Sequence, residues 1–207
     1  PRFHEEKRLV TDTLDVRPLS GEEAAARFDD LAGLRIAVFR AFPYLYDGDM
    51  AYERDYLATY MEAPGAFIAG AFDGDALVGA STAAPLGEHK AAFAEPFAAR
   101  GLDPDDFFYF GESVLLPAYR GRGAGVAFFD LREAEARRQG FAHCLFSAVI
   151  RPEDHPMRPD DYVPLDDFWR KRGYRRLEGF RTGFAWKDIG ETAETEKPME
   201  YWVKSLG

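Results

Sequence analysis

The hydrophobic and polar residues divide the chain into short apolar segments and longer segments that repeat apolar residues at helical spacing. The short segments suit a pleated sheet and predict strands at residues 13–19, 66–72, 76–83, 107–116, 142–150, 177–186 and 199–203. The longer segments predict helices at residues 20–41, 50–62, 88–100, 123–139 and 165–172. Asp73-Gly74-Asp75 predicts a hairpin, and the polar segment 190–197 is expected to be mobile.

A glycine-rich turn follows the predicted strand at 107–116. The apolar run ends near Pro117, a turn with three glycines in five residues follows, and a helix begins at once. This order directs several backbone N–H groups and the positive end of a helix dipole at one point, which is typical of a phosphate site. Arg120 and Arg122 add positive charge. The alternative is an ordinary tight turn with solvated arginines.

Two common phosphate-binding patterns do not fit this turn. The dinucleotide pattern G-x-G-x-x-G needs glycine where Val126 or Phe128 stands, and the Walker pattern needs a Gly-Lys-Ser/Thr ending that is absent. What remains is Arg120-x-x-Gly123-x-Gly125 after an apolar strand and Pro-x-Tyr-Arg-Gly. This motif resembles the acetyl-CoA pyrophosphate signature of the GNAT superfamily of N-acetyltransferases, Gln/Arg-x-x-Gly-x-Gly/Ala.

The order of the predicted elements is similar to that of the GNAT fold over most of the chain. The resemblance implies an α/β fold with a mixed central sheet flanked by helices on both faces, in one domain covering residues 1–207. The helix at 88–100 is an extra insert before the fourth strand of that fold. Residues 168–174, FWRKRGY, resemble the later family motif Leu-Tyr-x-x-x-Gly-Phe.

The amino-acid composition limits the classes of binding partner and indicates the cellular compartment. The net charge of −10 argues against a general nucleic-acid binder and suits an amine substrate. Cys144 is the only cysteine, which excludes an internal disulfide and fits a reducing cytoplasm. No apolar run has the length of a membrane span, and the four histidines lack metal-ligand spacing, so we expect no membrane contact and no metal.

The resemblance implies acetyl-CoA as co-substrate and assigns residues to it. In the family, pantetheine pairs with the backbone of the fourth strand where a bulge splays the sheet, and one N–H group stabilises the oxyanion. Counting back from the glycine turn, that edge is Ser113, Val114 and Leu115, although these residues also fit a plain central strand. The pyrophosphate is expected on Arg120, Gly121, Arg122, Gly123, Ala124, Gly125 and Val126.

Glu112 is the candidate catalytic base. It is the only formally charged residue between Phe107 and Arg120, and burying a carboxylate costs several kcal/mol unless it is paired or used. Its family position beside the acceptor cleft favours proton acceptance, directly or through water. The alternative is a structural ion pair with Arg17 or another arginine.

Trp169 stands where family members often have a tyrosine that protonates the leaving thiolate. An indole cannot do this, so either the thiolate leaves unassisted, which a thiol pKa of about 8.5 allows, or Tyr162 replaces the missing acid. We expect Trp169 to pack beside the cofactor.

The acceptor side has further candidates. Arg151, in a loop with three prolines, is a candidate clamp for an acceptor carboxylate, and His155 is a candidate proton relay. A rigid surface loop with solvated charges is the alternative. Tyr44, Tyr46 and Tyr109 are candidates for lining the acceptor pocket, with a core or rim position as the alternative.

We therefore expect a cytoplasmic enzyme that transfers the acetyl group of acetyl-CoA to the amine of a small molecule by direct attack on the thioester. One alternative is acetylation of a protein N-terminus or lysine. Another is a non-catalytic acyl-CoA-binding module, which Trp169 favours and Glu112 opposes. We expect no nucleic-acid partner and allow for a homodimer.

Overall fold

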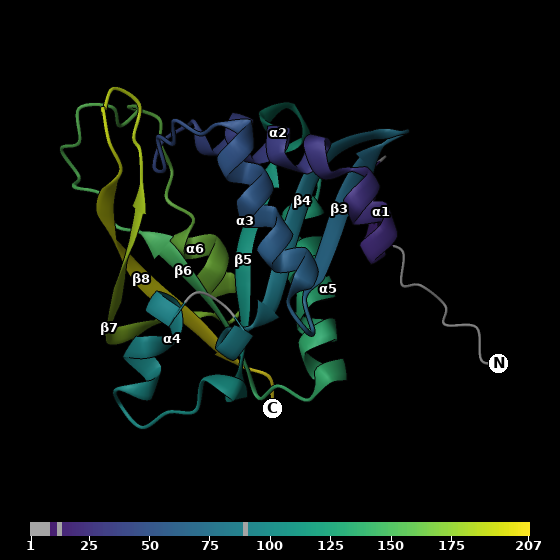
Figure 1. Ribbon diagram of the computed structural model, residues 1–207, viewed down its shortest axis with the longest axis vertical. Coiled ribbons are helices and arrows are strands. Elements are labelled where there is room, and N and C mark those ends of the chain that lie inside the picture. The colour runs from purple at the N-terminus through teal and green to yellow at the C-terminus, as the bar shows by residue number, and fades with distance from the viewer. Residues whose placement is uncertain (1–8, 12–13, 89–90) are drawn as a thin grey trace.

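The computed structural model describes residues 9–11, 14–88 and 91–207, which form one eight-stranded sheet with helices around it (Figure 1). The strand order is β1-β2-β3-β4-β5-β6-β8-β7, and every neighbouring pair is antiparallel except β5 and β6. The strands are β1 (Leu9–Thr11), β2 (Leu14–Pro18), β3 (Phe67–Asp73), β4 (Ala76–Pro85), β5 (Phe107–Leu115), β6 (His143–Val149), β7 (Arg175–Trp186) and β8 (Thr195–Ser205).

Helices cover both faces of this sheet. The α-helices are α1 (Gly21–Ala26), α2 (Phe28–Phe39), α3 (Met50–Glu62), α4 (Ala91–Ala98), α5 (Ala124–Gln139) and α6 (Asp166–Lys171). Residues of α2 and α3 share a core cluster with Val114, whereas α5 packs through Phe128 and Leu131 against Val16 and Val78. In Figure 1, α3 and α4 lie in front of the sheet, and α5 and α6 lie behind it. The predicted mixed sheet with helices on both faces is confirmed.

Local sequence signals explain the elements around the site. The predicted hairpin is confirmed, because Asp73 pairs with Ala76 across a two-residue turn in which Gly74 has φ 58°. α5 begins after Gly123 and ends at Gly140, both in the left-handed conformation that glycine adopts without strain. Thr13, where the first strand was predicted to begin, lies outside the described residues.

The predicted helix at 20–41 is wrong as a continuous element. α1 and α2 are separated at Arg27, whose backbone (φ −103°, ψ 17°) leaves the helical region. The Arg27 guanidinium lies 5.7 Å from the centre of the Phe72 ring and pairs with Asp30 at 3.2 Å. The sequence has no glycine or proline at this break. The contacts of the Arg27 side chain stabilise the break instead of a helix-breaking residue.

The C-terminal boundaries also differ from the prediction. β8 begins at Thr195 instead of residue 199, so the end of the segment expected to be mobile is part of the sheet. The buried Lys197 holds it there, since its Nζ donates to Trp186 O and Glu191 Oε2 at 3.0 Å. β7 begins at Arg175, and β1 was not predicted.

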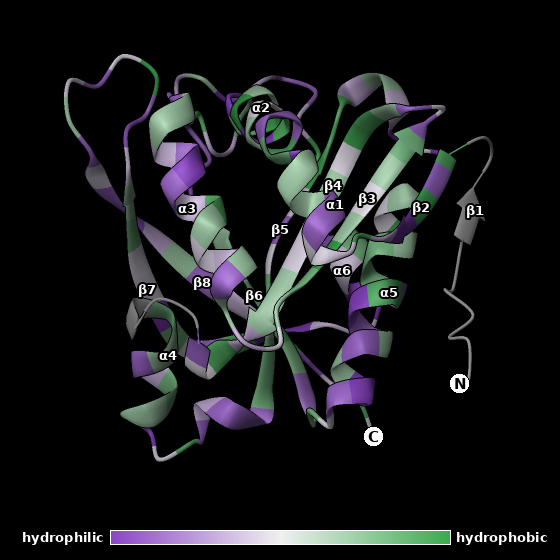
Figure 2. Ribbon diagram, turned by 45° about the vertical axis from the view of Figure 1, so that its right-hand side comes forward, coloured by the Kyte–Doolittle hydropathy of each residue, from purple (hydrophilic) through white to green (hydrophobic). Residues whose placement is uncertain are grey.

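The insert before β5 is shorter than the predicted helix at 88–100. A 3₁₀ turn covers Leu86–Glu88, residues 89–90 lie outside the description, and α4 covers Ala91–Ala98. Two further 3₁₀ turns, Pro104–Asp106 and Pro117–Tyr119, flank β5. Figure 2 shows hydrophobic and hydrophilic residues mixed along α3 and α5, as expected for helices with one buried side. Within the described residues, no helix combines the length and apolarity needed to cross a membrane.

Candidate active site

The sheet opens between β5 and β6. The two strands pair only from Phe107 opposite His143 to Phe110 opposite Phe146. β6 then continues beside β8, and β5 continues beside β4 as far as Leu115, so the strands diverge (Figure 1). Within the described part of the chain, the β6-facing edge of residues 111–115 therefore has no strand partner. A splayed sheet at this place is what the resemblance implies.

Backbone N–H groups of β5 point into this opening. The Leu116 N–H donates to Val78 O in β4 at 3.0 Å. Because consecutive backbone amides along a strand point to opposite sides, those of Ser113 and Leu115 point away from β4. The Leu115 carbonyl, which lies on the same side of the strand as the Leu115 N–H, also points away from β4, because it accepts a hydrogen bond from Arg120 Nε at 3.3 Å. Ser113 and Leu115 thus present N–H groups to an extended ligand, whereas the predicted contact Val114 directs its amide to β4.

A β-bulge interrupts β5 beside the opening. The register with β4 shifts between Ser81 and Ala83, so that Thr82 alone faces both Gly111 and Glu112. Such bulges change the direction in which side chains leave a strand. Here the bulge places residues 111 and 112 on the α2–α3 side of the sheet.

Glycine is required in the bulge for steric reasons. A Cβ atom on Gly111 would lie 2.0 Å from the Tyr60 hydroxyl oxygen and 2.6 Å from Thr82 Oγ1. Both distances are far below van der Waals contact, and the Tyr60 side chain is buried. Gly111 therefore lets α3 approach β5 closely enough for α3 tyrosines to reach Glu112.

Glu112 is buried, 7% exposed, in a network of charged and polar groups. Its Oε1 lies 2.6 Å from Arg35 Nη1 of α2, and its Oε2 accepts a hydrogen bond from the Tyr56 hydroxyl at 3.2 Å. Arg35 also bonds Glu53 of α3, so one guanidinium serves two carboxylates. The paired arginine is thus Arg35 and not Arg17, which pairs with other carboxylates.

The Arg35 guanidinium is the positively charged group of this network. Burial lowers the pKa of Arg35, but Glu112, Tyr56 and Glu53 together raise it well above its usual value. Counted by formal charge, one arginine and two carboxylates leave one excess negative charge beside the opening. A cationic acceptor amine is attracted to such a place.

Three tyrosines lie within the electrostatic influence of the Glu112 carboxylate. Burial, followed by Tyr162 and Glu112, raises the pKa of Tyr44 to about 12. Burial and then Glu112 raise the pKa values of Tyr56 and Tyr60 well above the usual tyrosine value. These hydroxyls stay protonated at neutral pH and can donate hydrogen bonds. Tyr44, a predicted pocket residue, lies within the electrostatic influence of Glu112.

The other two predicted pocket tyrosines differ in position. The Tyr109 ring is buried in the core under α4, and its hydroxyl shares a hydrogen bond with Ser147 Oγ at 2.6 Å across the start of the opening. Tyr46 is buried in a cluster with Trp186 and Met199. Tyr46 is therefore a core residue, as the alternative had it. The Tyr109 ring is also in the core, but its hydroxyl lies where the two strands begin to diverge.

The glycine turn has the geometry of an anion site. Gly121 (φ 76°) and Gly123 (φ 84°) take left-handed conformations, and α5 starts at Ala124 with no side-chain cap on its first turn. The first backbone N–H groups of α5 are thus left for a ligand, at the positive end of the helix dipole. The predicted order of strand, turn and helix is confirmed.

The side chains around the turn leave its backbone accessible. Arg120 and Arg122 are exposed, and Arg122 Nη2 donates to Ala118 O at 3.2 Å. Ala124 is buried, so it contributes through its backbone, while the Val126 side chain is 37% exposed. A pyrophosphate fits this arrangement of glycine backbone, helix start and free arginine charge.

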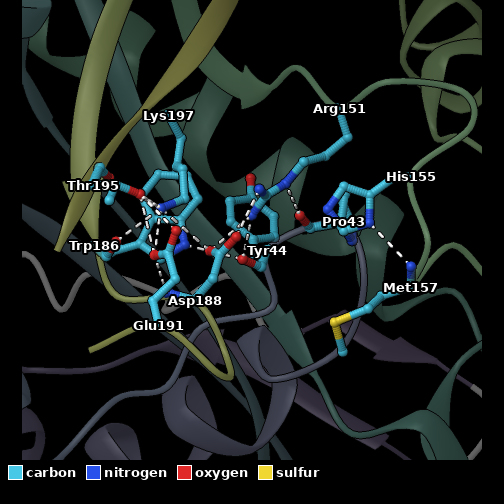
Figure 3. Close-up of polar contacts among 10 residues, drawn as sticks. All are labelled: Pro43, Tyr44, Arg151, His155, Met157, Trp186, Asp188, Glu191, Thr195 and Lys197. Carbon is cyan, nitrogen blue, oxygen red and sulfur yellow. Dashed lines mark hydrogen bonds and ion pairs between the residues drawn. The ribbon is translucent and has the colours of Figure 1, made fainter. Parts of the chain in front are cut away.

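Trp169 and the two candidate proton carriers occupy separate places. Trp169 lies 5.0 Å, between ring centres, from both Phe146 and Trp202, in the cluster behind the diverging strands. Tyr162 and His155 both lie against the ring of Phe42, at 4.7 Å and 5.6 Å between ring centres. Burial raises the pKa of Tyr162, and His155 Nδ1 accepts from the Met157 N–H at 3.1 Å (Figure 3).

Arg151 does not have the free guanidinium that a carboxylate clamp needs. Its Nη1 and Nη2 pair with the Asp188 carboxylate at 2.8 and 2.9 Å, and its remaining bonds go to the carbonyls of Pro43 and Tyr44 (Figure 3). The Arg151 side chain is largely buried, so the alternative of a solvated charge is wrong for Arg151, although most of the loop that follows it is exposed. The predicted clamp is corrected to an internal ion pair, because the chain itself supplies the carboxylate.

Sequence reasoning missed two arginines of the site. Arg132 of α5 is 1% exposed and donates to Thr82 O, Glu112 O and Ser113 Oγ at 3.4, 3.1 and 2.8 Å, so it joins both strands at the bulge. Burial lowers its pKa to about 10. Arg35 had a usable signal, as the only charged residue between Asp30 and Arg40 in an apolar helix. Arg132 had none, since α5 contains several arginines.

A family model described as "Acetyltransferase (GNAT) family" matches residues 33–159, more than half of the chain. The chain belongs to this acetyltransferase family. It is therefore an acyltransferase, with acetyl-CoA as co-substrate, as the resemblance implied.

Solved structures agree with the GNAT assignment at the level of the fold. The Salmonella typhimurium protein yncA, solved with its cofactor acetyl-CoA, superposes with a TM-score of 0.60 at 10% identity, covering 95% of each chain. A ribosomal-protein-alanine N-acetyltransferase from Brucella melitensis gives 0.59 at 11% identity, covering 92% and 98%. An aminoglycoside 6'-acetyltransferase type Ii gives 0.57 at 16% identity, covering 93% and 97%. No curated protein shows significant sequence similarity to the chain.

Proposed function

We propose that this GNAT enzyme acetylates the amine of a small molecule, with Glu112 as general base. The observation that carries the proposal is the bulge, which turns a buried carboxylate toward α2 and α3 at the residues where β5 also leaves β6. A proton acceptor and N–H donors are thereby placed within three residues of one another, at the end of an anion-binding turn.

The residues of the chain have distinct roles in this proposal. The turn from Arg120 to Val126 holds the pyrophosphate, and the N–H groups of Ser113 and Leu115 bind pantetheine or the thioester oxygen. Acetyl-CoA supplies the acetyl thioester. Glu112 takes a proton from the acceptor ammonium, directly or through water, so that the free amine forms a C–N bond as the C–S bond breaks. The nitrogen then releases its second proton to solvent, which leaves a neutral amide. Tyr162 or solvent protonates the leaving thiolate.

The acceptor side favours a small cationic molecule. The polar side chains on this side include Glu112, Tyr44, Tyr56 and Tyr162, which are buried or half-buried and suit a compact ligand better than an extended peptide. The excess negative charge of the Arg35 network attracts an ammonium group. The aminoglycoside 6'-acetyltransferase among the structural neighbours supports the small-molecule reading by its name, whereas the ribosomal-protein-alanine N-acetyltransferase represents the alternative.

A thiol-release assay tests the proposal. Acetyl-CoA is offered with lysine, spermidine, kanamycin, an alanine-starting peptide and a lysine-containing peptide. We expect CoA release with at least one of the three small amines. Release with the peptides alone would make the chain a protein acetyltransferase, and binding of acetyl-CoA without release would make it a binding module.

The role of Glu112 is tested with Glu112→Gln, which keeps the shape but cannot accept the proton. We expect kcat to fall about 10²–10⁴-fold at unchanged acetyl-CoA affinity. Glu133→Gln is the matched control, because Glu133 is also a buried carboxylate in an ion pair, 2.7 Å from Lys204 Nζ. Near-normal kcat/KM in a folded Glu112→Gln variant would reject Glu112 as base.

A further inference from the structure

The loop between α2 and α3 carries Tyr44 and has an unusual backbone. Leu45 takes a left-handed conformation (φ 55°) although it is not glycine, and its side chain is buried. Such a conformation is strained for a residue other than glycine and persists only where surrounding contacts enforce it. The contacts that hold Leu45 in this conformation come from segments that also fix the backbone of Tyr44.

Arg151 and Asp188 provide these contacts from two distant segments. Arg151 follows β6 and donates from Nε to Pro43 O at 2.7 Å and from Nη2 to Tyr44 O at 2.8 Å. Asp188 follows β7 and fixes the same guanidinium through both of its carboxylate oxygens, as Figure 3 shows. The planar guanidinium is thus held in one orientation, with its remaining donors directed at the loop.

The segment around Asp188 adds further bonds to the same loop. Trp186 Nε1 donates to Tyr44 O at 3.0 Å, and the Ile189 N–H donates to Leu45 O at 2.7 Å. Lys197 Nζ lies 3.6 Å from Asp188 Oδ1, which places a second cation beside this carboxylate. The Tyr44 carbonyl therefore receives donors from two segments, and little freedom remains for the Tyr44 backbone.

The side chain of Tyr44 extends from this fixed backbone toward the acceptor side. Its ring lies between Phe39, at 4.7 Å, and Trp186, at 6.0 Å, measured between ring centres. Its hydroxyl lies within the electrostatic influence of Tyr162 and of the candidate base Glu112. A rigid backbone and a packed ring are what a residue needs in order to orient a bound molecule.

We propose that Arg151 and Asp188 form a positioning pair, which holds Tyr44 at the acceptor site so that its hydroxyl orients the acceptor amine next to Glu112. This inference rests on the proposed function. It assigns Arg151 an indirect role in acceptor recognition, through Tyr44, in place of direct contact with an acceptor carboxylate.

A double-mutant cycle tests the coupling between Arg151 and Tyr44. The variants are Tyr44→Phe, Arg151→Met and their combination, assayed for acceptor KM with the fastest amine among lysine, spermidine and kanamycin. In the wild-type background, Tyr44→Phe should raise acceptor KM about 3–10-fold, the value of one hydrogen bond. In the Arg151→Met background it should raise KM less than about twofold, because the hydroxyl is no longer held in place. Equal effects in both backgrounds would overturn the proposal.

Two further variants separate positioning from stability. Arg151→Lys keeps the charge next to Asp188 but loses the planar fork, and we expect acceptor KM between those of wild type and Arg151→Met. Lys204→Met breaks the ion pair with Glu133 behind the sheet and should lower stability without changing acceptor KM. A rise in acceptor KM in Lys204→Met equal to that in Arg151→Met would show that the effect is one of general stability.

A fluorotyrosine probe at position 44 tests the positioning without any acceptor. Fluorine NMR follows its titration, and its pKa should lie above that of free fluorotyrosine in the wild type and fall toward it in Arg151→Met. An unchanged pKa in Arg151→Met would overturn the proposal. If no amine in the panel is acetylated, the proposed function fails, and this titration still decides whether Arg151 positions Tyr44.

Discussion

Replacing Gly111 by alanine tests whether the bulge in β5 organises the site. The added Cβ would lie 2.0 Å from the Tyr60 hydroxyl oxygen and 2.6 Å from Thr82 Oγ1. Both partners must move by about 1 Å to reach van der Waals contact, and Tyr60 is almost fully buried, so neither can turn toward solvent. Overpacking of this kind costs about 1–3 kcal/mol, and the two simultaneous clashes place Gly111→Ala at the upper end.

The loss is measurable by thermal unfolding and by thiol release. For a chain of this size, about 1 kcal/mol corresponds to about 2–4 °C in Tm, so Gly111→Ala should lower Tm by about 4–12 °C. It should also lower kcat, since Glu112 is the next residue. Gly33→Ala is the control: its Cβ meets nothing within 4 Å in α2, so it should stabilise by about 0.5–1 kcal/mol. An unchanged Tm and rate for Gly111→Ala would refute the steric argument.

Two predictions concern the glycine turn and the hairpin between β7 and β8. Gly123→Val should weaken acetyl-CoA binding by about 2 kcal/mol or more in calorimetry, while Gly101→Val, equally strained at φ 71° but exposed on another loop, should leave the affinity unchanged. The backbone N–H of Asp188, then Lys197, lowers the pKa of Glu191 from 4.5 to about 2, so the wild type should lose stability as pH falls between these values. Glu191→Gln should flatten this loss in acid-unfolding curves, and parallel curves would contradict the assignment.

Local sequence signals predicted the fold well because the elements around the site have strong local causes. Gly74 supports the hairpin, and Gly123 and Gly140 delimit α5. The break at Arg27 and the early start of β8 were missed, because both depend on contacts with residues distant in the sequence.

The candidate site was predictable where one segment contains the chemistry. The turn from Arg120 to Gly125 and the carboxylate of Glu112 belong to continuous motifs. The function suggested for Arg151 could not be settled in this way, because its partner Asp188 lies 37 residues further along the chain. A charged side chain in a loop gives no indication of whether the chain itself will supply the opposite charge.

The short parallel contact between β5 and β6 has a mechanical consequence. Within the described residues, the backbone pairing of the two strands is limited to the pairs from Phe107–His143 to Phe110–Phe146, with core clusters on both faces of this line. We expect bending of the sheet to concentrate at this line, with the pair Phe110–Phe146 as its fulcrum. A substitution that changes the ring volume at Phe110 or Phe146 should therefore change the angle at which β5 and β6 diverge. The size of the acyl or acceptor group that fits can thus change while every reacting group stays the same.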